Sequence, residues 1–274
     1  MTPNDIRLDG KVAFITGGAN GIGAGIAHNL IAFGARVAVA DIDQQAGQQL
    51  ATSLRENGGD ALFVHTDVNH TEQIVAAVEQ VSEHFGRFDI LVNNAGGVRR
   101  TPFLEQTEKS WRKHIDFNLI STLASSQAAA RAMIDGGQGG VIINIASSEG
   151  LRAAPGFAVY AACKAGIISF TRSMALELAE HDIRVHALAP DMILTPGIKP
   201  YFDAVGESGR AARDRYIPMG RVGTTDELAG VVIFLASKLA SYVTGLTLPV
   251  DGGAIASSGW TRSPLTGAWE LYHP

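Results

Sequence analysis

The chain has 274 residues, of which 46% are hydrophobic and 18% are charged. This apolar fraction excludes an intrinsically disordered chain, and the length can bury a sizeable core. The net charge of −5 provides no positive field for nucleic acid or an anionic membrane surface, and the one cysteine, Cys163, excludes an intramolecular disulfide. A polar N-terminal segment and the lack of a membrane-length apolar run favour a soluble, cytoplasmic protein.

Short runs rich in Val and Ile alternate with longer segments of helical period. Between the first two runs, apolar residues recur at helical steps on one face, at Ile22, Ile26, Leu30 and Phe33. Near-continuous apolar strands separated by helices predict an α/β fold of one domain, a Rossmann-type doubly wound parallel sheet with about seven strands and helices on both faces. The predicted strands are Val12–Thr16, Arg36–Ala40, Ala61–Thr66, Ile90–Asn93, Val141–Ile145, Arg184–Ala189 and Leu246–Val250.

Two stretches depart from this rhythm. Residues 191 to about 222 form a long connection after the sixth predicted strand, and connections of this length are usually functional or mobile. Residues 254–274 show no strong periodicity but contain Trp260, Trp269 and Tyr272. We therefore expect one domain over residues 1–253, with a substrate loop at about 191–222 and a C-terminal tail at 254–274.

A glycine-rich segment, Thr16-Gly-Gly-Ala-Asn-Gly-Ile-Gly23, joins the first predicted strand to a helix. Its glycines permit a tight turn and let backbone N–H groups approach a pyrophosphate, which the helix N-terminus also favours. Such a turn can instead serve only to pack helix on sheet, but its place between strand and helix favours a dinucleotide site. The predicted contacts are Gly17, Asn20, Gly21, Ile22 and Gly23.

An acidic residue, Asp41, follows the second predicted strand, where a carboxylate can accept hydrogen bonds from the hydroxyl groups of an adenosine ribose. It would repel a 2′-phosphate at 4 Å by about 1–4 kcal/mol, roughly a tenfold to thousandfold effect. No Arg or Lys in the glycine-rich segment or directly after Asp41 offsets the repulsion. NAD is therefore predicted over NADP, whereas a simple helix-capping role for Asp41 would predict no preference.

Tyr160 and Lys164 are spaced to share one helix face. A tyrosine with an ordinary pKa of about 10 is a poor base at neutral pH, and a nearby cation favours its phenolate. The hydroxyl of Ser147, after the fifth predicted strand, could hold a carbonyl or alcohol oxygen while Tyr160 exchanges a proton with it. The Tyr-x-x-x-Lys spacing alone is common and most often marks a solvated face. Cys163, between the two, is expected to point into helix packing.

Taken in order, these segments resemble the short-chain dehydrogenase/reductase family, in its main single-domain branch, from about residue 9 to residue 253. The glycine-rich segment is similar to the family's cofactor loop, and Asn118, Ser147, Tyr160 and Lys164 match its catalytic tetrad. The remaining matches are Asp67-Val68 to the adenine-contacting pair, Asn93-Asn94-Ala95-Gly96 to the motif lining the cofactor, Pro190 to Thr195 to the nicotinamide segment, and Asp251-Gly252-Gly253 to the usual end.

The resemblance implies an enzyme that transfers a hydride between NAD and a secondary alcohol or ketone. Tyr160 would be the general acid/base, Ser147 would orient the reacting oxygen, and Lys164 would hold the nicotinamide ribose and lower the pKa of Tyr160. Asn118 would anchor a water that links Lys164 to solvent, or would only bridge helix and sheet. The further implied cofactor contacts are Ile42, Asp67, Val68, Asn94, Ala95, Gly96, Tyr160, Lys164, Pro190, Ile193 and Thr195.

The substrate pocket is less determined. Arg99, Glu149 and Arg152 are candidate rim residues, although surface arginines are more often only solvated. Asp191 follows Pro190 where the family usually has glycine, so its carboxylate would either favour the positively charged oxidised cofactor or face solvent. The histidines show no metal-ligand spacing, and no metal is predicted.

Two other functions stay open. A 3-oxoacyl thioester reductase usually prefers NADPH and a basic surface, and both Asp41 and the net acidity count against it. A non-catalytic dinucleotide-binding sensor would not need Ser147, Tyr160 and Lys164 together. The resemblance further implies a homo-oligomer, with a homotetramer favoured, acting on a small-molecule alcohol or ketone. The 254–274 tail would then pack on the surface or close a pocket of its own or a neighbouring subunit.

Overall fold

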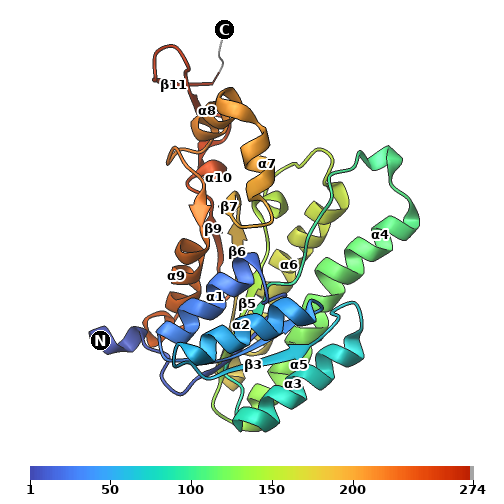
Figure 1. Ribbon diagram of the computed structural model, residues 1–274, viewed down its shortest axis with the longest axis vertical. Coiled ribbons are helices and arrows are strands. Elements are labelled where there is room, and N and C mark those ends of the chain that lie inside the picture. Colours follow the sequence, from blue (N-terminus) through green and yellow to red (C-terminus); the bar gives the residue numbers. More distant parts are fainter. Residues whose placement is uncertain (272–274) are drawn as a thin grey trace.

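The seven apolar runs of the sequence pair into one sheet in which all neighbours are parallel (Figure 1). In the computed structural model, which describes residues 1–271, the strand order is β3-β2-β1-β4-β5-β6-β9. The predicted Rossmann-type fold is therefore confirmed, and each predicted strand end lies within one residue of the observed end. The strands are β1 Val12–Thr16, β2 Arg36–Asp41, β3 Ala61–His65, β4 Ile90–Asn93, β5 Gly140–Ile145, β6 Ile183–Pro190 and β9 Thr247–Val250.

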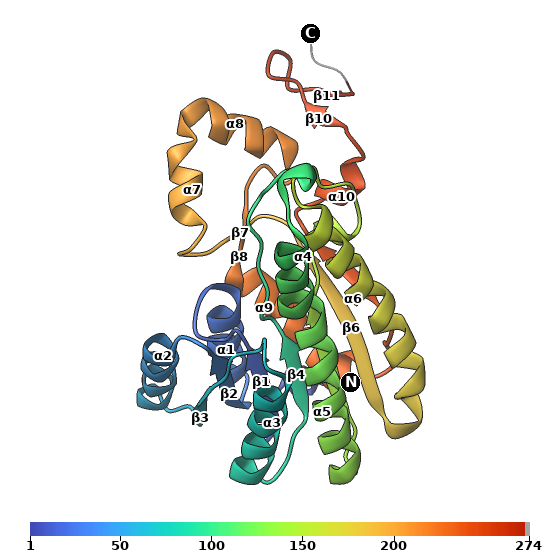
Figure 2. The same ribbon diagram turned by 90° about the vertical axis from the view of Figure 1, so that its right-hand side faces the viewer.

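Helices cover both faces of this sheet. One apolar core lies between the sheet and α1, α2 and α9, and a second lies between the sheet and α3, α5 and α6 (Figure 2). The long helices are α1 Gly21–Ala32, α2 Gln44–Glu56, α3 Thr71–Phe85, α4 Glu108–Ile115, α5 Ser121–Gly136, α6 Ala158–Glu177 and α9 Thr225–Ala236. The short helical turns are η1 Pro3–Ile6, η2 Phe103–Glu105, η4 Ser148–Gly150, η5 Ala179–His181 and η6 Lys238–Ala240.

The register brings the carboxyl ends of the central strands level with one another. Thr16 at the end of β1 pairs with Ala40 and Asn93, and Asn93 pairs with Asn144 of β5. The segments that follow these strands therefore meet at one edge of the sheet, where ligands bind in open α/β sheets. At one side of the sheet, β9 pairs only with β6 and contains Pro249.

The 191–222 segment contains two helices rather than a plain loop. Helices α7 Lys199–Ala204 and α8 Gly206–Tyr216 lie between β7 Ile193–Leu194 and β8 Gly223–Thr224, and these two short strands pair in parallel. In both views the helices lie at the same end of the molecule as the hairpin formed by residues 261–270 (Figures 1 and 2). The sequence does not reveal α8 because this helix has no buried residue and thus no apolar stripe.

The C-terminal tail is also ordered as far as it is described. Helix α10 Ala254–Ser257 is followed by a small antiparallel hairpin of β10 Thr261–Arg262 and β11 Trp269–Glu270. The guanidinium of Arg262 lies 4.6 Å from the centre of the Trp269 ring. Tyr272 and the end of the predicted tail lie outside the described residues. Within residues 1–271, no helix has both the length and the apolar character needed to cross a membrane.

Candidate active site

A cavity of about 680 Å³ lies at the carboxyl edge of the sheet, where the glycine-rich segment, the end of β2 and the start of α6 meet. It brings together most of the residues that the sequence proposes for cofactor and catalysis. Those lining it are Gly17, Asn20, Gly21, Ile22, Asp41, Ile42, Asp67, Val68, Asn94, Ala95, Gly96, Ser147, Tyr160, Lys164, Pro190 and Thr195.

Three predicted residues lie behind this lining. Gly23 is buried in the first turn of α1, and Asn118 is buried in the helix below the cavity. Ile193 is in β7 and lines a smaller cavity with Ile217 and Gly223. Contact of these residues with a cofactor would therefore be indirect or through the backbone.

The three rim candidates do not line the cavity either. Arg99 is exposed on the loop that follows β4. Glu149 and Arg152 come after Ser147 and reach the cavity through Asp191, which does line it.

The sequence did not single out several residues of the cavity wall. Asn69 and Lys113 add polar groups to the wall, and Phe117 adds an aromatic ring. Lys113 and Phe117 are four residues apart, so their helical spacing was the available signal. The remaining residues of this kind are Thr66, Ile145, Ala146 and Gly197.

The glycine-rich segment packs too closely for side chains. A Cβ on Gly23 would lie 2.4 Å from the Gly17 carbonyl oxygen and 2.7 Å from Asn94 Nδ2, and Gly17 itself has a φ of +60°. Asn20, the N-cap of α1, makes no side-chain capping bond. The first helical turn thus presents backbone amides to the cavity wall, which is the arrangement that fits a pyrophosphate.

Asp41 joins the glycine-rich segment to the turn after β2. Its Oδ2 accepts a hydrogen bond from the Ala19 amide at 3.0 Å, and its Oδ1 accepts one from the Asp43 amide at 2.9 Å. The cap of α2 is Asp43, which accepts from Ala46 N, so Asp41 is not the helix cap. A carboxylate has further lone pairs, and this one lines the cavity.

Asp67 holds the turn after β3 in a similar way. Its Oδ1 accepts hydrogen bonds from the Asn69 amide and side chain at 2.9 and 2.7 Å. Burial acts in the opposite direction, but these bonds and the nearby His70 hold the pKa of Asp67 below its ordinary value. The carboxylate therefore stays ionised and fixes the wall of the cavity next to Val68.

Tyr160 and Lys164 sit one turn apart on α6, with Lys164 Nζ 5.5 Å from the centre of the Tyr160 ring. Burial raises the pKa of Tyr160, and the hydroxyl of Ser147 opposes that rise. Burial also lowers the pKa of Lys164 to about 8. Burial therefore sets the direction of the pKa shift of Tyr160, and the expectation that Lys164 lowers this pKa stays a prediction.

Lys164 is held by the main chain rather than by a carboxylate. Its Nζ donates a hydrogen bond to the carbonyl oxygen of Ile145 at 2.7 Å, at the end of β5. Cys163 beside it is buried, and its thiol faces the His114 carbonyl at 3.8 Å, as its predicted packing role requires. The ammonium group thereby points into the cavity from a fixed position.

Asn118 lies in η3 Asp116–Ile120, a π-helical turn that joins α4 to α5. Its Oδ1 accepts from the Gly97 amide at 2.9 Å, and its Nδ2 donates to the carbonyl oxygens of Gly97 and His114 at 3.1 and 3.0 Å. A Cβ on Gly96 would lie 2.9 Å from Asn118 Oδ1 and 3.3 Å from Lys164 Nζ, which shows how near the two groups are. Asn118 thus ties its helix to the loop after β4 and not to a strand, and the proton-relay role stays a prediction.

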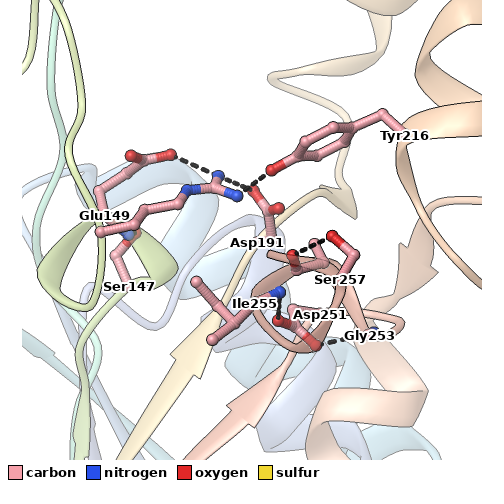
Figure 3. A network of polar contacts seen from close by, with 10 residues as sticks. Ser147, Glu149, Asp191, Tyr216, Asp251, Gly253, Ile255 and Ser257 are labelled. Atoms are coloured by element: carbon pink, nitrogen blue, oxygen red, sulfur yellow. Dashed lines mark hydrogen bonds and ion pairs between the residues drawn. The ribbon is translucent and has the colours of Figure 1, made fainter. Parts of the chain in front are cut away.

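A charged cluster closes the cavity on the side of the 191–222 segment. Arg152 Nη2 donates to Glu149 Oε1 at 2.8 Å and to Asp191 Oδ1 at 3.2 Å, and its Nη1 contacts the hydroxyl of Tyr216 at the end of α8. Figure 3 shows Glu149, Asp191 and Tyr216 pointing toward one another. Of the two sequence alternatives for Asp191, exposure to solvent is wrong, because its side chain is 8% exposed.

The match to known proteins covers nearly all of this architecture. Residues 17–254 match a family model described as enoyl-(acyl carrier protein) reductase. The chain belongs to the short-chain dehydrogenase/reductase family. It is therefore an oxidoreductase of the class that interconverts secondary alcohols and ketones, and the matched region contains the whole cavity.

Relatives within this family have different substrates. The chain is 40% identical over 255 residues to a sorbitol dehydrogenase of Cereibacter sphaeroides, covering 90% of this chain and 98% of that one. It is 39% identical over 249 residues to the 3-oxoacyl-[acyl-carrier-protein] reductase FabG of Chlamydia pneumoniae, covering 91% and 98%. A crystal structure of a short-chain type dehydrogenase/reductase from Mycobacterium marinum superposes with a TM-score of 0.85 at 36% identity, covering 92% and 98%.

Proposed function

We propose that this short-chain dehydrogenase/reductase uses NAD and oxidises a secondary alcohol to a ketone, or catalyses the reverse reaction. The observation that carries the proposal is that Ser147, Tyr160 and Lys164 share one cavity with the glycine-rich segment and Asp41. A protein that only binds a dinucleotide needs the glycine-rich segment and Asp41. It does not need Ser147, Tyr160 and Lys164. The carboxylate of Asp41 supports NAD because it would repel a 2′-phosphate.

The side chains divide the chemistry between them. Ser147 donates a hydrogen bond to the substrate oxygen and places it beside the Tyr160 hydroxyl. In the oxidative direction Tyr160, as phenolate, takes the hydroxyl proton, while the hydrogen on the same carbon leaves with its electron pair. A bound nicotinamide dinucleotide would supply the acceptor for that hydride. Lys164, buried and fixed by Ile145, places a positive charge beside the developing phenolate.

The relatives favour two substrate classes. Sorbitol dehydrogenase of Cereibacter sphaeroides and galactitol 2-dehydrogenase of Agrobacterium fabrum, both 40% identical, support a polyol. The FabG relatives and the description of the family model support a carrier-bound thioester as the second candidate. We favour the polyol because Arg152, which bonds to the cavity-lining Asp191, is already paired with two carboxylates.

The test is NADH formation from NAD across sugar alcohols, alicyclic alcohols, steroids and 3-hydroxyacyl thioesters, with NADP in parallel. We expect turnover with NAD that falls by about 10²- to 10⁴-fold in Tyr160→Phe while NADH binding, followed by fluorescence, is retained. Near-normal turnover by Tyr160→Phe would refute the mechanism. Turnover only with NADP and 3-hydroxyacyl thioesters would replace the proposal by its second candidate.

The family resemblance also supports a homotetramer in the cytoplasm, and both stay proposals. Light scattering coupled to size-exclusion chromatography tests the first. A monomer at micromolar concentration would contradict it.

A further inference from the structure

Asp191 brings a buried carboxylate to the wall that also carries Ser147 and Tyr160. It directly follows β6 and lines the cavity, and its side chain is 8% exposed. Its Oδ1 accepts the hydrogen bond from Arg152, but its Oδ2 is buried and has no hydrogen-bond partner. A buried acceptor without a donor carries an uncompensated desolvation cost. The site thus has hydrogen-bonding capacity that the residues around it do not use.

The charges around Asp191 select the kind of group that would use this capacity. One guanidinium, that of Arg152, serves both Glu149 and Asp191, and Asp251 adds a further negative charge nearby. The Asp251 carboxylate is occupied by the amides of Gly253 and Ile255 at 2.9 and 2.8 Å (Figure 3). The cluster therefore carries excess negative charge, which repels an anionic group, while the unpartnered Oδ2 of Asp191 can accept a hydrogen bond from a neutral donor such as a hydroxyl.

The geometry lets Asp191 meet a ligand without losing its anchor. Arg152 is itself fixed by Glu149 and by Tyr216, with its guanidinium carbon 5.6 Å from the centre of the Tyr216 ring. A carboxylate accepts on both oxygens, so while Oδ1 keeps the bond to Arg152, Oδ2 can accept a second hydrogen bond from a group in the cavity that Asp191 lines. Arg152 is thus the positioning residue, and Asp191 is the group presented to the cavity.

We propose that Asp191 determines substrate specificity by accepting a hydrogen bond from a hydroxyl group on a carbon next to the reacting one. The preferred substrate is then an uncharged alcohol with vicinal hydroxyl groups. The inference rests on the proposed function, because Ser147 and Tyr160 define where the reacting carbon lies. It goes further by naming the residue and the functional group that decide which alcohol is oxidised.

The experiment compares 2,3-butanediol with 2-butanol, which share one carbon skeleton and differ in a single hydroxyl. For the wild type we expect kcat/KM to favour the diol by at least about tenfold, since a site built to bind a hydroxyl rejects the analogue that lacks it. Asp191→Ala should lower kcat/KM for the diol about 10- to 100-fold and leave 2-butanol within about threefold. For Asp191→Asn, which keeps a neutral acceptor, kcat/KM for the diol should lie between the values for the wild type and for Asp191→Ala.

The matched control is Asp203→Asn. Asp203 is a carboxylate of the same 191–222 segment, but it pairs with Lys199 at 2.6 Å and is half exposed. It should leave both substrates unchanged. NADH fluorescence and thermal melting establish that each variant folds, and if Asp191→Ala does not fold, Asp191→Asn must still lower the diol preference.

Three results would overturn the inference. An unchanged ratio of diol to 2-butanol in the folded Asp191 variants would show that Asp191 does not contact the second hydroxyl. An equal loss for both substrates would show a purely structural role. In either case Tyr160-dependent turnover by the wild type would leave the proposed function standing. If no alcohol is oxidised in a Tyr160-dependent manner, the proposed function fails and this inference fails with it.

Discussion

Replacing Asp41 by asparagine removes one negative charge from the adenosine end of the cavity and keeps the shape of the side chain. The carboxylate now accepts hydrogen bonds from Ala19 N and Asp43 N, and an amide oxygen can keep one of them. At 4 Å a 2′-phosphate is repelled by about 4 kcal/mol for an effective dielectric constant of 20 and about 1 kcal/mol for water. Because Asp41 is half-buried beside open solvent, we expect a repulsion energy of about 1–2 kcal/mol. This energy corresponds to a roughly 5- to 30-fold change in the preference between the two cofactors.

The assay is kcat/KM with NAD and with NADP, measured at fixed ionic strength, together with the affinities for both reduced cofactors by fluorescence. For Asp41→Asn we expect the NADP-to-NAD ratio of kcat/KM to rise by this 5- to 30-fold factor. The loss of hydrogen bonds to the ribose should also weaken NAD binding. Added salt should shrink the effect, since exposed charges are screened.

Asp43→Asn is the matched control, because Asp43 lies two residues away but caps α2 through Ala46 N. Asparagine is an equally good N-cap, so this variant should keep both stability and cofactor preference. The electrostatic account of cofactor choice is refuted if Asp41→Asn retains cofactor binding and leaves the ratio within about twofold of the wild type, or if Asp43→Asn shifts the ratio equally.

Two further predictions concern Lys164 and Gly23. Because burial lowers the pKa of Lys164 from 10.5 to about 8, the unfolded state binds more protons between these values and stability rises with pH across that window. Lys164→Met should therefore raise the free energy of unfolding at pH 7 by up to about 3 kcal/mol, as measured by urea titration. This gain in stability should shrink by pH 10. A gain that does not depend on pH would contradict the burial argument. Gly23→Ala places a Cβ 2.4 Å from the Gly17 carbonyl oxygen and should weaken NADH binding at least about tenfold. Gly136→Ala, where no atom lies within 4 Å, should leave NADH binding unchanged; equal binding by both variants would argue against the tight cradle.

The sheet and the cofactor end of the cavity could be predicted because their signals are local. A run such as Val12–Thr16 is buried at every position, so its apolar character marks its limits within a residue. The glycine-rich segment begins at the last residue of β1, and Asp41 is the last residue of β2. In a parallel sheet, residues that follow strands meet at one edge, so their proximity follows from the strand order alone.

The reactive end could be predicted only in part, because its properties depend on tertiary packing. The sequence shows that Lys164 follows Tyr160 by one turn, but not that burial raises the pKa of the phenol. It also does not show that Arg152 bridges Glu149 and Asp191, since Asp191 lies on a different element. Helix α8, which supplies Tyr216, has no apolar stripe that would reveal it.

Pro249 limits how copies of this protein can associate through the side of the sheet formed by β9. The carbonyl oxygens of Leu246 and Val250 accept hydrogen bonds from the amides of Ala187, in β6, and Asp191, which directly follows β6. Backbone groups in a parallel strand point alternately to either side, so those of Pro249 point outward, away from β6. Proline has no N–H to donate there. A further strand therefore cannot extend the sheet by a regular ladder at this position, and any assembly of subunits across it must be held by side-chain packing, which protects the protein from open-ended edge-to-edge aggregation.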